Sequence, residues 1–160
     1  GQVRQVEDSF SGLDHLEGCT VSVLADGAVQ PQQVVTAGAI TIPVEATKIH
    51  IGLPITSDLK TLPPTMQVEA YGQARQKNIN KVWLRLYRSS GIFVGPNENS
   101  LTELKQRTNE PYGMPPVLVS EEVGIPVMPS WGADAQILVR HDDPIPLTLV
   151  SISMEVVFGG

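Results

Sequence analysis

The stretch "INKVWLRLYRSSGIFVG", residues 79–95, contains the clearest strand pattern in the sequence. Apolar side chains alternate in it with charged and aromatic ones. Because successive side chains of a β-strand point to opposite faces, the apolar set shares one face, and this face is predicted to lie in the core. Strands nearer the C-terminus are expected to complete that core. The predicted core residues are Val82, Leu84, Leu86, Ile137, Val139 and Leu149.

Short apolar runs of the same kind continue outward in both directions from this stretch. Thirteen prolines and fourteen glycines interrupt any helical period, so the fold class is predicted to be all-β with little or no helix. We expect two small packed β-lobes, a barrel-like lobe over residues 1–62 and an antiparallel β-sandwich over residues 63–160. The boundary follows from Pro63-Pro64, which marks a crossover between lobes.

Two local patterns predict how particular segments turn. Asp26-Gly27 follows the alternating run "TVSVLA" and predicts a tight hairpin, because both residue types tolerate positive φ. Ser100 and Glu103 match a helix capping box, which favours a short helical turn in competition with the surrounding strands.

Bulk composition limits the class of protein. The chain has 160 residues, 41% of them hydrophobic, which suffices for a real core. Its net charge of −6 disfavours non-specific binding of the whole molecule to nucleic acid or to an anionic membrane. The single Cys19 excludes an internal disulfide and a cysteine-based zinc site and is consistent with a reducing cytoplasm. No signal peptide or membrane-spanning segment is expected.

The motif "GLDHLEGC", residues 12–19, gathers residue types that catalysis uses. Cys19 has His15, Asp14 and Glu17 as sequence neighbours, but a nucleophile needs a base within hydrogen-bond reach, which sequence proximity does not supply. We therefore expect Cys19 to be a buried structural residue without a catalytic role.

A second group, His141, Asp142 and Asp143, contains nitrogen and oxygen donors that metals bind. Adjacent strand residues point to opposite faces, and a turn before Pro144 accounts for the two aspartates more simply. We predict no metal, no cofactor and no enzymatic activity. A hydrolase that uses His141 remains a remote alternative.

One charge pattern stands out between Glu69 and Glu98, where no acidic residue occurs. If a single strand runs through this region, its basic and aromatic residues share the face opposite the core. Such a stripe suits a nucleic-acid backbone, an acidic patch on a neighbouring subunit, or plain solvent. The stripe residues are Arg75, Lys77, Lys81, Trp83, Arg85 and Tyr87.

Four segments together resemble a known family. They are "FSGLDHLEGCTVSVLADG" (10–27), "IHIGLPITSDLKTLPP" (49–64), "INKVWLRLYRSSGIFVGP" (79–96) and "HDDPIPLTLVSISMEVVFGG" (141–160). In this order they resemble the C-terminal part of tailed-phage virion structural proteins, of the stabilisation, tail-tubular or nozzle type. The first lobe also resembles the β half-domain that flanks the first catalytic cysteine region of ubiquitin-activating enzymes, without its catalytic machinery.

The resemblance implies a non-catalytic subunit of a tailed phage or prophage particle, at the head-to-tail connector or in the tail. It implies a homo-oligomer of the full-length protein, contacts with other tail or connector proteins, and proximity to channel DNA, with no membrane partner. The location implied is the virion, assembled in the host cytoplasm.

The alternative of a different class is a β-sandwich module that binds a host surface glycan. Exposed aromatic residues in proline-rich loops, such as Trp131 and Tyr112, would then form the sugar platform.

Overall fold

The computed structural model describes residues 6–65, 75–104 and 114–159. The chain divides by its contacts into two compact units. Unit 1 comprises residues 1–56, 107–117 and 142–145, and unit 2 comprises residues 57–106, 118–141 and 146–160. The first division therefore lies at 56/57, before strand β6 (Ser57–Lys60), whereas the sequence predicted it at 62/63.

The prediction of an all-β fold is confirmed, since every strand pairing in the described residues is antiparallel. The one helical element among them is a single 3-10 turn, η1 (Asp14–Leu16). In this described part of the chain, no helix is long and apolar enough to cross a membrane.

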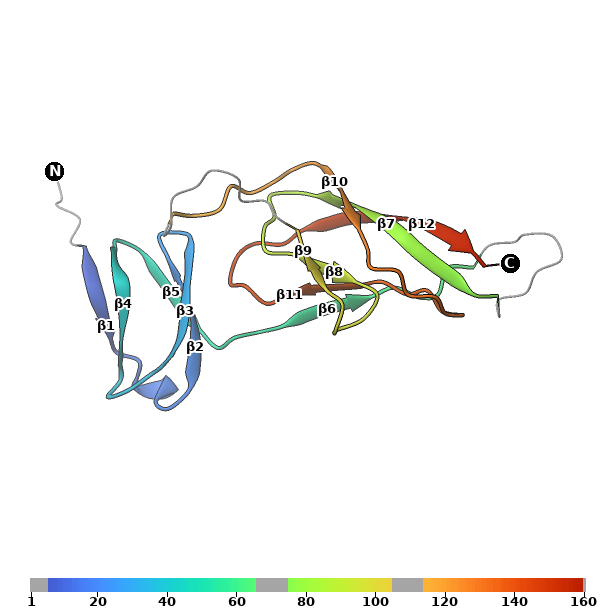
Figure 1. The fold of residues 1–160 in the computed structure, drawn as a ribbon. Coiled ribbons are helices and arrows are strands. Elements are labelled where there is room, and N and C mark those ends of the chain that lie inside the picture. The colour runs from blue at the N-terminus through green and yellow to red at the C-terminus, as the bar shows by residue number, and fades with distance from the viewer. Residues whose placement is uncertain (1–5, 66–74, 105–113, 160) are drawn as a thin grey trace. The chain divides into compact units, whose positions relative to one another are not determined.

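Unit 1 contains two small sheets (Figure 1). One pairs β1 (Glu7–Ser11) with β4 (Ala39–Ala46), and the other has the order β3-β2-β5, with β2 at Thr20–Ala25, β3 at Ala28–Val34 and β5 at Ile49–Gly52. Their shared core consists of Val21, Val23, Ala25, Val35, Ile40, Ile42 and Ala46. Small and β-branched side chains dominate it, which fits closely packed short strands.

The predicted hairpin at Asp26-Gly27 is present between β2 and β3. Asp26 has a φ of 47° and Gly27 a φ of 85°, the left-handed conformations that a tight two-residue hairpin turn requires. A second such turn joins Thr36 to Ala39, where Gly38 has a φ of 65°. A Cβ on Gly38 would lie 2.5 Å from Oδ1 of Asp14, so both backbone conformation and space demand glycine there.

Unit 2 contains a three-stranded and a four-stranded sheet (Figure 1). The first has the order β10-β7-β12, with β7 at Lys77–Leu86, β10 at Glu122–Pro126 and β12 at Leu149–Phe158. The second has the order β6-β11-β8-β9, with β6 at Ser57–Lys60, β8 at Phe93–Gly95, β9 at Thr102–Glu103 and β11 at Leu138–His141. Buried side chains from both sheets form one cluster, the arrangement of a β-sandwich.

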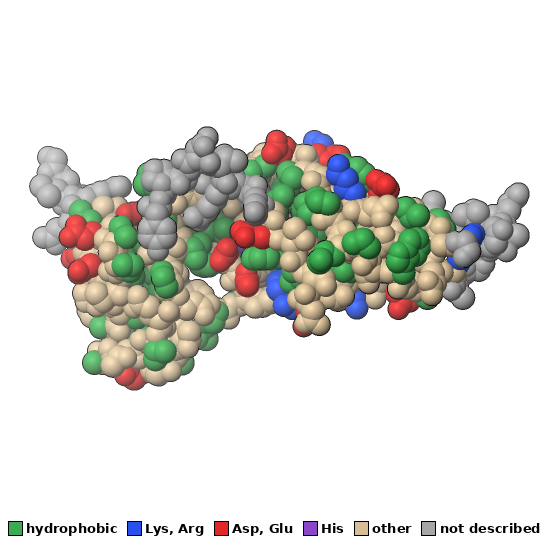
Figure 2. All heavy atoms as spheres, viewed as in Figure 1, with side chains coloured by type: hydrophobic (Ala, Val, Ile, Leu, Met, Phe, Trp, Pro, Cys, Tyr) green, Lys and Arg blue, Asp and Glu red, His purple; other side chains and the backbone are tan. Residues whose placement is uncertain are grey.

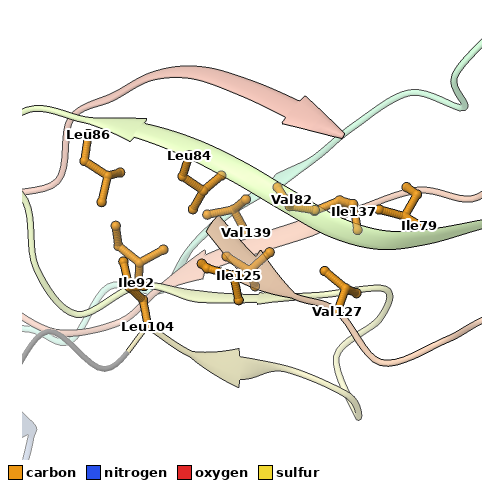
Figure 3. Close-up of a cluster of buried hydrophobic side chains, with 11 residues drawn as sticks. Ile79, Val82, Leu84, Leu86, Ile92, Leu104, Ile125, Val127, Ile137 and Val139 are labelled. Carbon is orange, nitrogen blue, oxygen red and sulfur yellow. The ribbon is translucent and has the colours of Figure 1, made fainter. Parts of the chain in front are cut away.

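This core follows the alternation expected from the sequence (Figure 3). Five of the six predicted core residues are buried, and Leu149 is partly buried against the same cluster. The central strand β7 supplies Ile79, Val82, Leu84 and Leu86 to it. Val94 and Val139 of the other sheet face them, and Ile125 of β10 lies beside Val82 in the same sheet.

The expected helical turn at Ser100 and Glu103 is wrong for these residues. Asn97–Ser100 instead forms a turn, with the Ser100 N–H donating to the Asn97 carbonyl at 3.2 Å, and Thr102–Glu103 pairs with β8. Leu104 is buried, and its N–H donates to the Ile92 carbonyl at 2.8 Å. Cross-strand pairing and burial of Leu104 therefore outweigh the local capping preference.

We expect Leu84→Ala to destabilise unit 2 by about 2–5 kcal/mol, because it leaves a cavity under a fully buried side chain. Both tryptophans of the chain, Trp83 and Trp131, lie in unit 2, so urea unfolding followed by tryptophan fluorescence measures this unit. Val150→Ala, on an exposed position, serves as the control and should change the midpoint little. An equal, small effect of both substitutions would contradict the assigned core.

Candidate functional site

The outer face of the three-stranded sheet carries most of the predicted stripe. Lys81, Trp83 and Arg85 alternate along β7 with the buried core residues and lie on the face away from the core. Tyr87, one residue beyond the strand end, is exposed. The structure therefore brings these four side chains to one surface, which we call the outer stripe.

Lys77 does not belong to the outer stripe, so the prediction for this residue is wrong. β7 contains a bulge at Asn80: Glu155 pairs with Lys81, but the next residue, Val156, pairs with Ile79. The extra residue reverses the alternation on its N-terminal side. Lys77 is consequently on the core side, only 3% exposed, and its Nζ donates to the Ala133 carbonyl at 2.8 Å.

Arg75 also points to protein rather than to an open surface. It is half-buried, and its Nε donates a hydrogen bond to the backbone carbonyl of Gly159. Arg75 and Lys77 thus fasten the beginning of β7 to neighbouring backbone, and two of the four predicted cations are used in folding.

The two remaining cations lie opposite carboxylates. In the strand register Arg85 faces Glu122 of β10, and Lys81 faces Glu155 of β12. Cross-strand neighbours on one face of a sheet lie close enough for opposite charges to attract. Over the whole face in view in Figure 2, on which no single residue is identified, Lys and Arg side chains lie near Asp and Glu side chains. The outer stripe is therefore a surface of mixed charge.

A glycine shapes the centre of this surface. The Lys81 ammonium lies 5.0 Å from the centroid of the Trp83 ring, a cation–π contact. On the adjacent strand, a Cβ at Gly124 would lie 2.7 Å from Cε of Lys81 and 3.1 Å from Nε1 of Trp83. Gly124 thus leaves the space in which the lysine and the indole lie. An isolated glycine within a strand pattern signals such a close approach, and this signal was missed in the sequence.

Two acidic residues of the N-terminal motifs, Glu17 and Asp26, bind backbone amides of turns. The two carboxylate oxygens of Glu17 accept N–H bonds from Ala37 at 3.0 Å and Gly38 at 2.7 Å. This contact fixes the turn between β3 and β4 against the loop that precedes β2.

Asp26 plays the corresponding part at the turn between β4 and β5. Its carboxylate accepts bonds from the N–H and hydroxyl of Thr47, each at 2.8 Å, and from the N–H of Lys48 at 2.9 Å. A hollow of about 500 Å³ beside it is lined by Leu24, Asp26, Gly27, Thr47, Lys48 and His50. The only carboxylate in this lining is already engaged with the turn.

Cys19 is exposed, which corrects the prediction of a buried thiol. Its backbone is well bonded, since its N–H donates to the Leu16 carbonyl and its carbonyl accepts from the Val35 N–H. The buried run of β2 begins two residues later, at Val21, so Cys19 precedes the alternation that would have turned it inward.

His141 ends β11 and is half-buried, and Asp143–Ile145 forms the bend that the sequence predicted before Pro144. Nε2 of His141 is shielded and has no hydrogen-bond partner among the described residues. Within that described part of the chain, no three His, Cys, Asp or Glu side chains are grouped closely enough to hold a metal ion.

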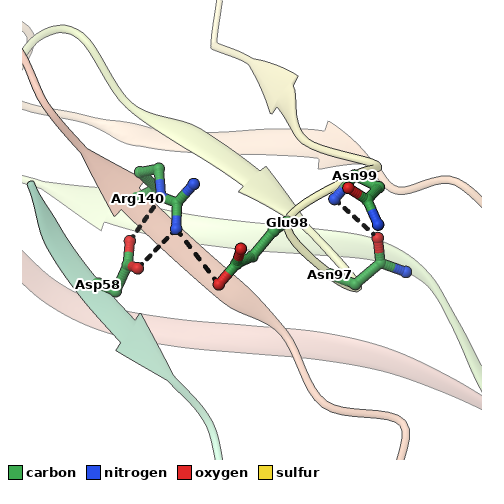
Figure 4. Close-up of polar contacts among 5 residues, drawn as sticks. All are labelled: Asp58, Asn97, Glu98, Asn99 and Arg140. Carbon is green, nitrogen blue, oxygen red and sulfur yellow. Dashed lines mark hydrogen bonds and ion pairs between the residues drawn. The ribbon is translucent and has the colours of Figure 1, made fainter.

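A second charged cluster lies on the four-stranded sheet (Figure 4). Nε and Nη2 of Arg140 each donate to an oxygen of Asp58 at 2.7 Å, and Nη2 lies 3.5 Å from Oε1 of Glu98. The hydrogen bonds from Arg140, with its positive charge, hold the pKa of Asp58 below 3.8 against a smaller opposing effect of desolvation. Because Asp58 and Arg140 are 82 residues apart, no local pattern predicts this pair.

No protein-family model matches the chain, and none of the curated proteins compared with it gives a significant match.

We expect Gly124→Ala to displace the end of Lys81 from Trp83 with little loss of stability, because a lysine end moves easily. The emission of Trp83, recorded in a Trp131→Phe background, should shift as its neighbour moves. Gly52→Ala, where an added Cβ meets no atom within 4 Å, is the matched control. An unchanged Trp83 emission would show that Gly124 does not shape the outer stripe.

The Asp58–Arg140 pair should stabilise β6 in a pH-dependent way. Since the pKa of Asp58 is lowered in the folded state, its contribution is fully present above the unfolded value of 3.8 and is lost as the pH falls through the folded value. Wild type and Asp58→Asn should therefore differ in urea midpoint at neutral pH and converge in strong acid. A difference that grows on acidification would contradict the assignment.

Proposed function

We propose that the chain is a non-catalytic structural subunit of a tailed phage or prophage particle, at the head-to-tail connector or in the tail. What supports the proposal is the role of the residues that carry the family resemblance. Glu17 of "GLDHLEG" and Asp26 of "VLADG" accept bonds from the backbone amides of two turns. The motifs on which the resemblance rests are thus motifs that specify a β-scaffold.

Within this proposal, the outer stripe is a contact with a neighbouring subunit rather than a track for DNA. Its two cations lie opposite Glu122 and Glu155, so the surface lacks the continuous positive potential that attracts a phosphate backbone. A protein surface of mixed charge with Trp83 and Tyr87 suits an interface in which each charge finds a partner.

An acidic surface that fits the outer stripe occurs on unit 1. Residues 1–56 contain six acidic and two basic residues. Three of the acidic ones, Glu7, Asp8 and Glu45, are exposed on the paired strands β1 and β4, where Glu7 lies opposite Ala46. A neighbouring copy that offered Glu45 to Arg85 would combine opposite charges.

Presence in the particle is the direct test of the proposal. Virions that encode this chain would be purified, and the chain sought by mass spectrometry and by immunogold labelling in electron micrographs. We expect label at the head-to-tail junction or along the tail. Detection in the infected lysate but not in purified virions would refute the structural role.

The subunit contact predicts a specific charge reversal. Arg85→Glu should prevent assembly of rings or tubes seen by negative-stain microscopy, while DNA affinity measured by fluorescence anisotropy stays unchanged. Adding Glu45→Arg in the same chain should restore assembly, because the acidic group then at residue 85 of one copy meets the basic group at residue 45 of the next. Arg88→Glu, the same change just beyond β7, is the control and should assemble normally. Assembly of Arg85→Glu as in wild type would refute the contact.

The glycan-binding alternative has one observation in its favour. Trp131 is 51% exposed, and a Cβ at Gly159 would lie 3.3 Å from Cζ3 of its ring, so the backbone at Gly159 lies close to one part of an otherwise accessible side chain. Tyr112 lies outside the described residues. Binding on a glycan array that Trp131→Ala abolishes would favour this alternative over the virion role.

A further inference from the structure

Strand β6 forms an open edge of the four-stranded sheet. Among the described strands it pairs only with β11, and all four of its residues, Ser57–Lys60, are exposed. An uncovered edge presents a row of backbone donors and acceptors to which another strand can pair. This edge is independent of the outer stripe, which lies on the other sheet.

The register identifies which backbone groups point outward from this edge. The Thr61 N–H donates to the Ile137 carbonyl at 2.9 Å, so this opposed pair is hydrogen-bonded. Hydrogen-bonded and non-hydrogen-bonded pairs alternate along an antiparallel ladder. Leu59 opposite Val139 is then hydrogen-bonded, whereas the backbone N–H and C=O groups of Asp58 and Lys60 point away from β11.

We infer that β6 pairs with β6 of a second copy of this chain across a two-fold axis at Leu59. In this register Asp58 lies opposite Lys60 of the second copy, and Lys60 opposite its Asp58. Both are the positions whose backbone groups point outward, so four backbone hydrogen bonds form between the copies. The contact is isologous and closes as a dimer with a continuous eight-stranded sheet.

Charge selects this register over its neighbours. Centring the two-fold axis on Asp58 or on Lys60 would also align the outward backbone groups, but it would place like charges directly opposite one another, which is destabilising. Only the register centred on Leu59 pairs unlike charges. Charged residues that normally protect an edge strand thus become specific for one partner.

The contacts that Asp58 makes within its own chain extend the alternation of unlike charges across the β6–β6 contact. Arg140 lies between Asp58 and Glu98 on the same chain, so acidic and basic groups alternate from Glu98 through Arg140 and Asp58 to Lys60 of the second copy. On the opposite face Leu59, 48% exposed in the single chain, meets its counterpart beside buried Val139. The pairing therefore covers apolar surface at Leu59, and each of these four charged groups keeps a neighbour of opposite charge.

Cysteine cross-linking tests the geometry directly. Opposed residues of a non-hydrogen-bonded pair have Cα atoms about 4.5 Å apart, within the range of a disulfide, whereas residues two positions off are about 7–8 Å apart. In the full chain with Cys19→Ser, which removes the exposed native thiol, Leu59→Cys should form a disulfide-linked dimer on mild oxidation. Lys60→Cys is the matched control and should not. Equal cross-linking of the two variants would overturn the register.

Charge variants test the same contact without disulfides. By sedimentation velocity the wild-type chain should dimerise, and Lys60→Glu should raise the dimer Kd by about tenfold or more, because the new carboxylate faces Asp58. Lys48→Glu, the same charge change on unit 1, should have no effect. A mixture of Lys60→Glu and Asp58→Lys chains should form heterodimers more tightly than either variant forms homodimers.

The outcomes are separable from those of the proposed function. Arg85→Glu, which disrupts the contact proposed for the outer stripe, should leave the β6 dimer intact. A wild-type chain that stays monomeric at the highest soluble concentration and does not cross-link through Leu59→Cys would refute the dimer while leaving the virion role standing.

Discussion

The pairing of β7 with strands on both of its sides is the interaction on which unit 2 depends. β7 is the middle strand of its sheet, and its inward side chains form the largest single contribution to the core. β10 and β12 do not pair with each other, so their places are set by hydrogen bonds to β7. Burial of Val82 and Leu84 fixes which face of β7 turns inward, because a slip of one residue would expose them.

The sequence predicted the class of fold because strand alternation and turn chemistry are local. The core face of β7 and the Asp26-Gly27 hairpin follow from residues a few positions apart. The bulge at Asn80 has no comparable local signal, since it depends on pairing with β12, more than seventy positions later. A prediction that did not include this bulge therefore placed Lys77 on the wrong face of β7. Strand pairing without a local signal also explains the wrong prediction at β9, where pairing with β8 outweighs the capping box that begins at Ser100.

The candidate site shows why residue types alone misidentify chemistry. Glu17 stands in a motif that gathers catalytic residue types, but its carboxylate accepts bonds from the amides of a turn distant in sequence, as does the carboxylate of Asp26. A turn with left-handed residues exposes its N–H groups together, and a carboxylate satisfies two or more of them at once. An acidic residue beside a glycine turn is therefore as much an architectural pattern as a catalytic one, and only geometry separates the two.

The distribution of charge connects the fold to assembly. The net charge of −6 arises mainly in residues 1–56, where six acidic residues accompany two basic ones. On the described sheet faces of unit 2, by contrast, Lys81, Arg85 and Arg140 each lie opposite or beside a carboxylate. Such faces are close to neutral locally, so the repulsion expected between two acidic chains is weak where these faces approach, since charges beyond about 8 Å are screened at physiological salt. Association through unit 2 is thus compatible with an acidic chain.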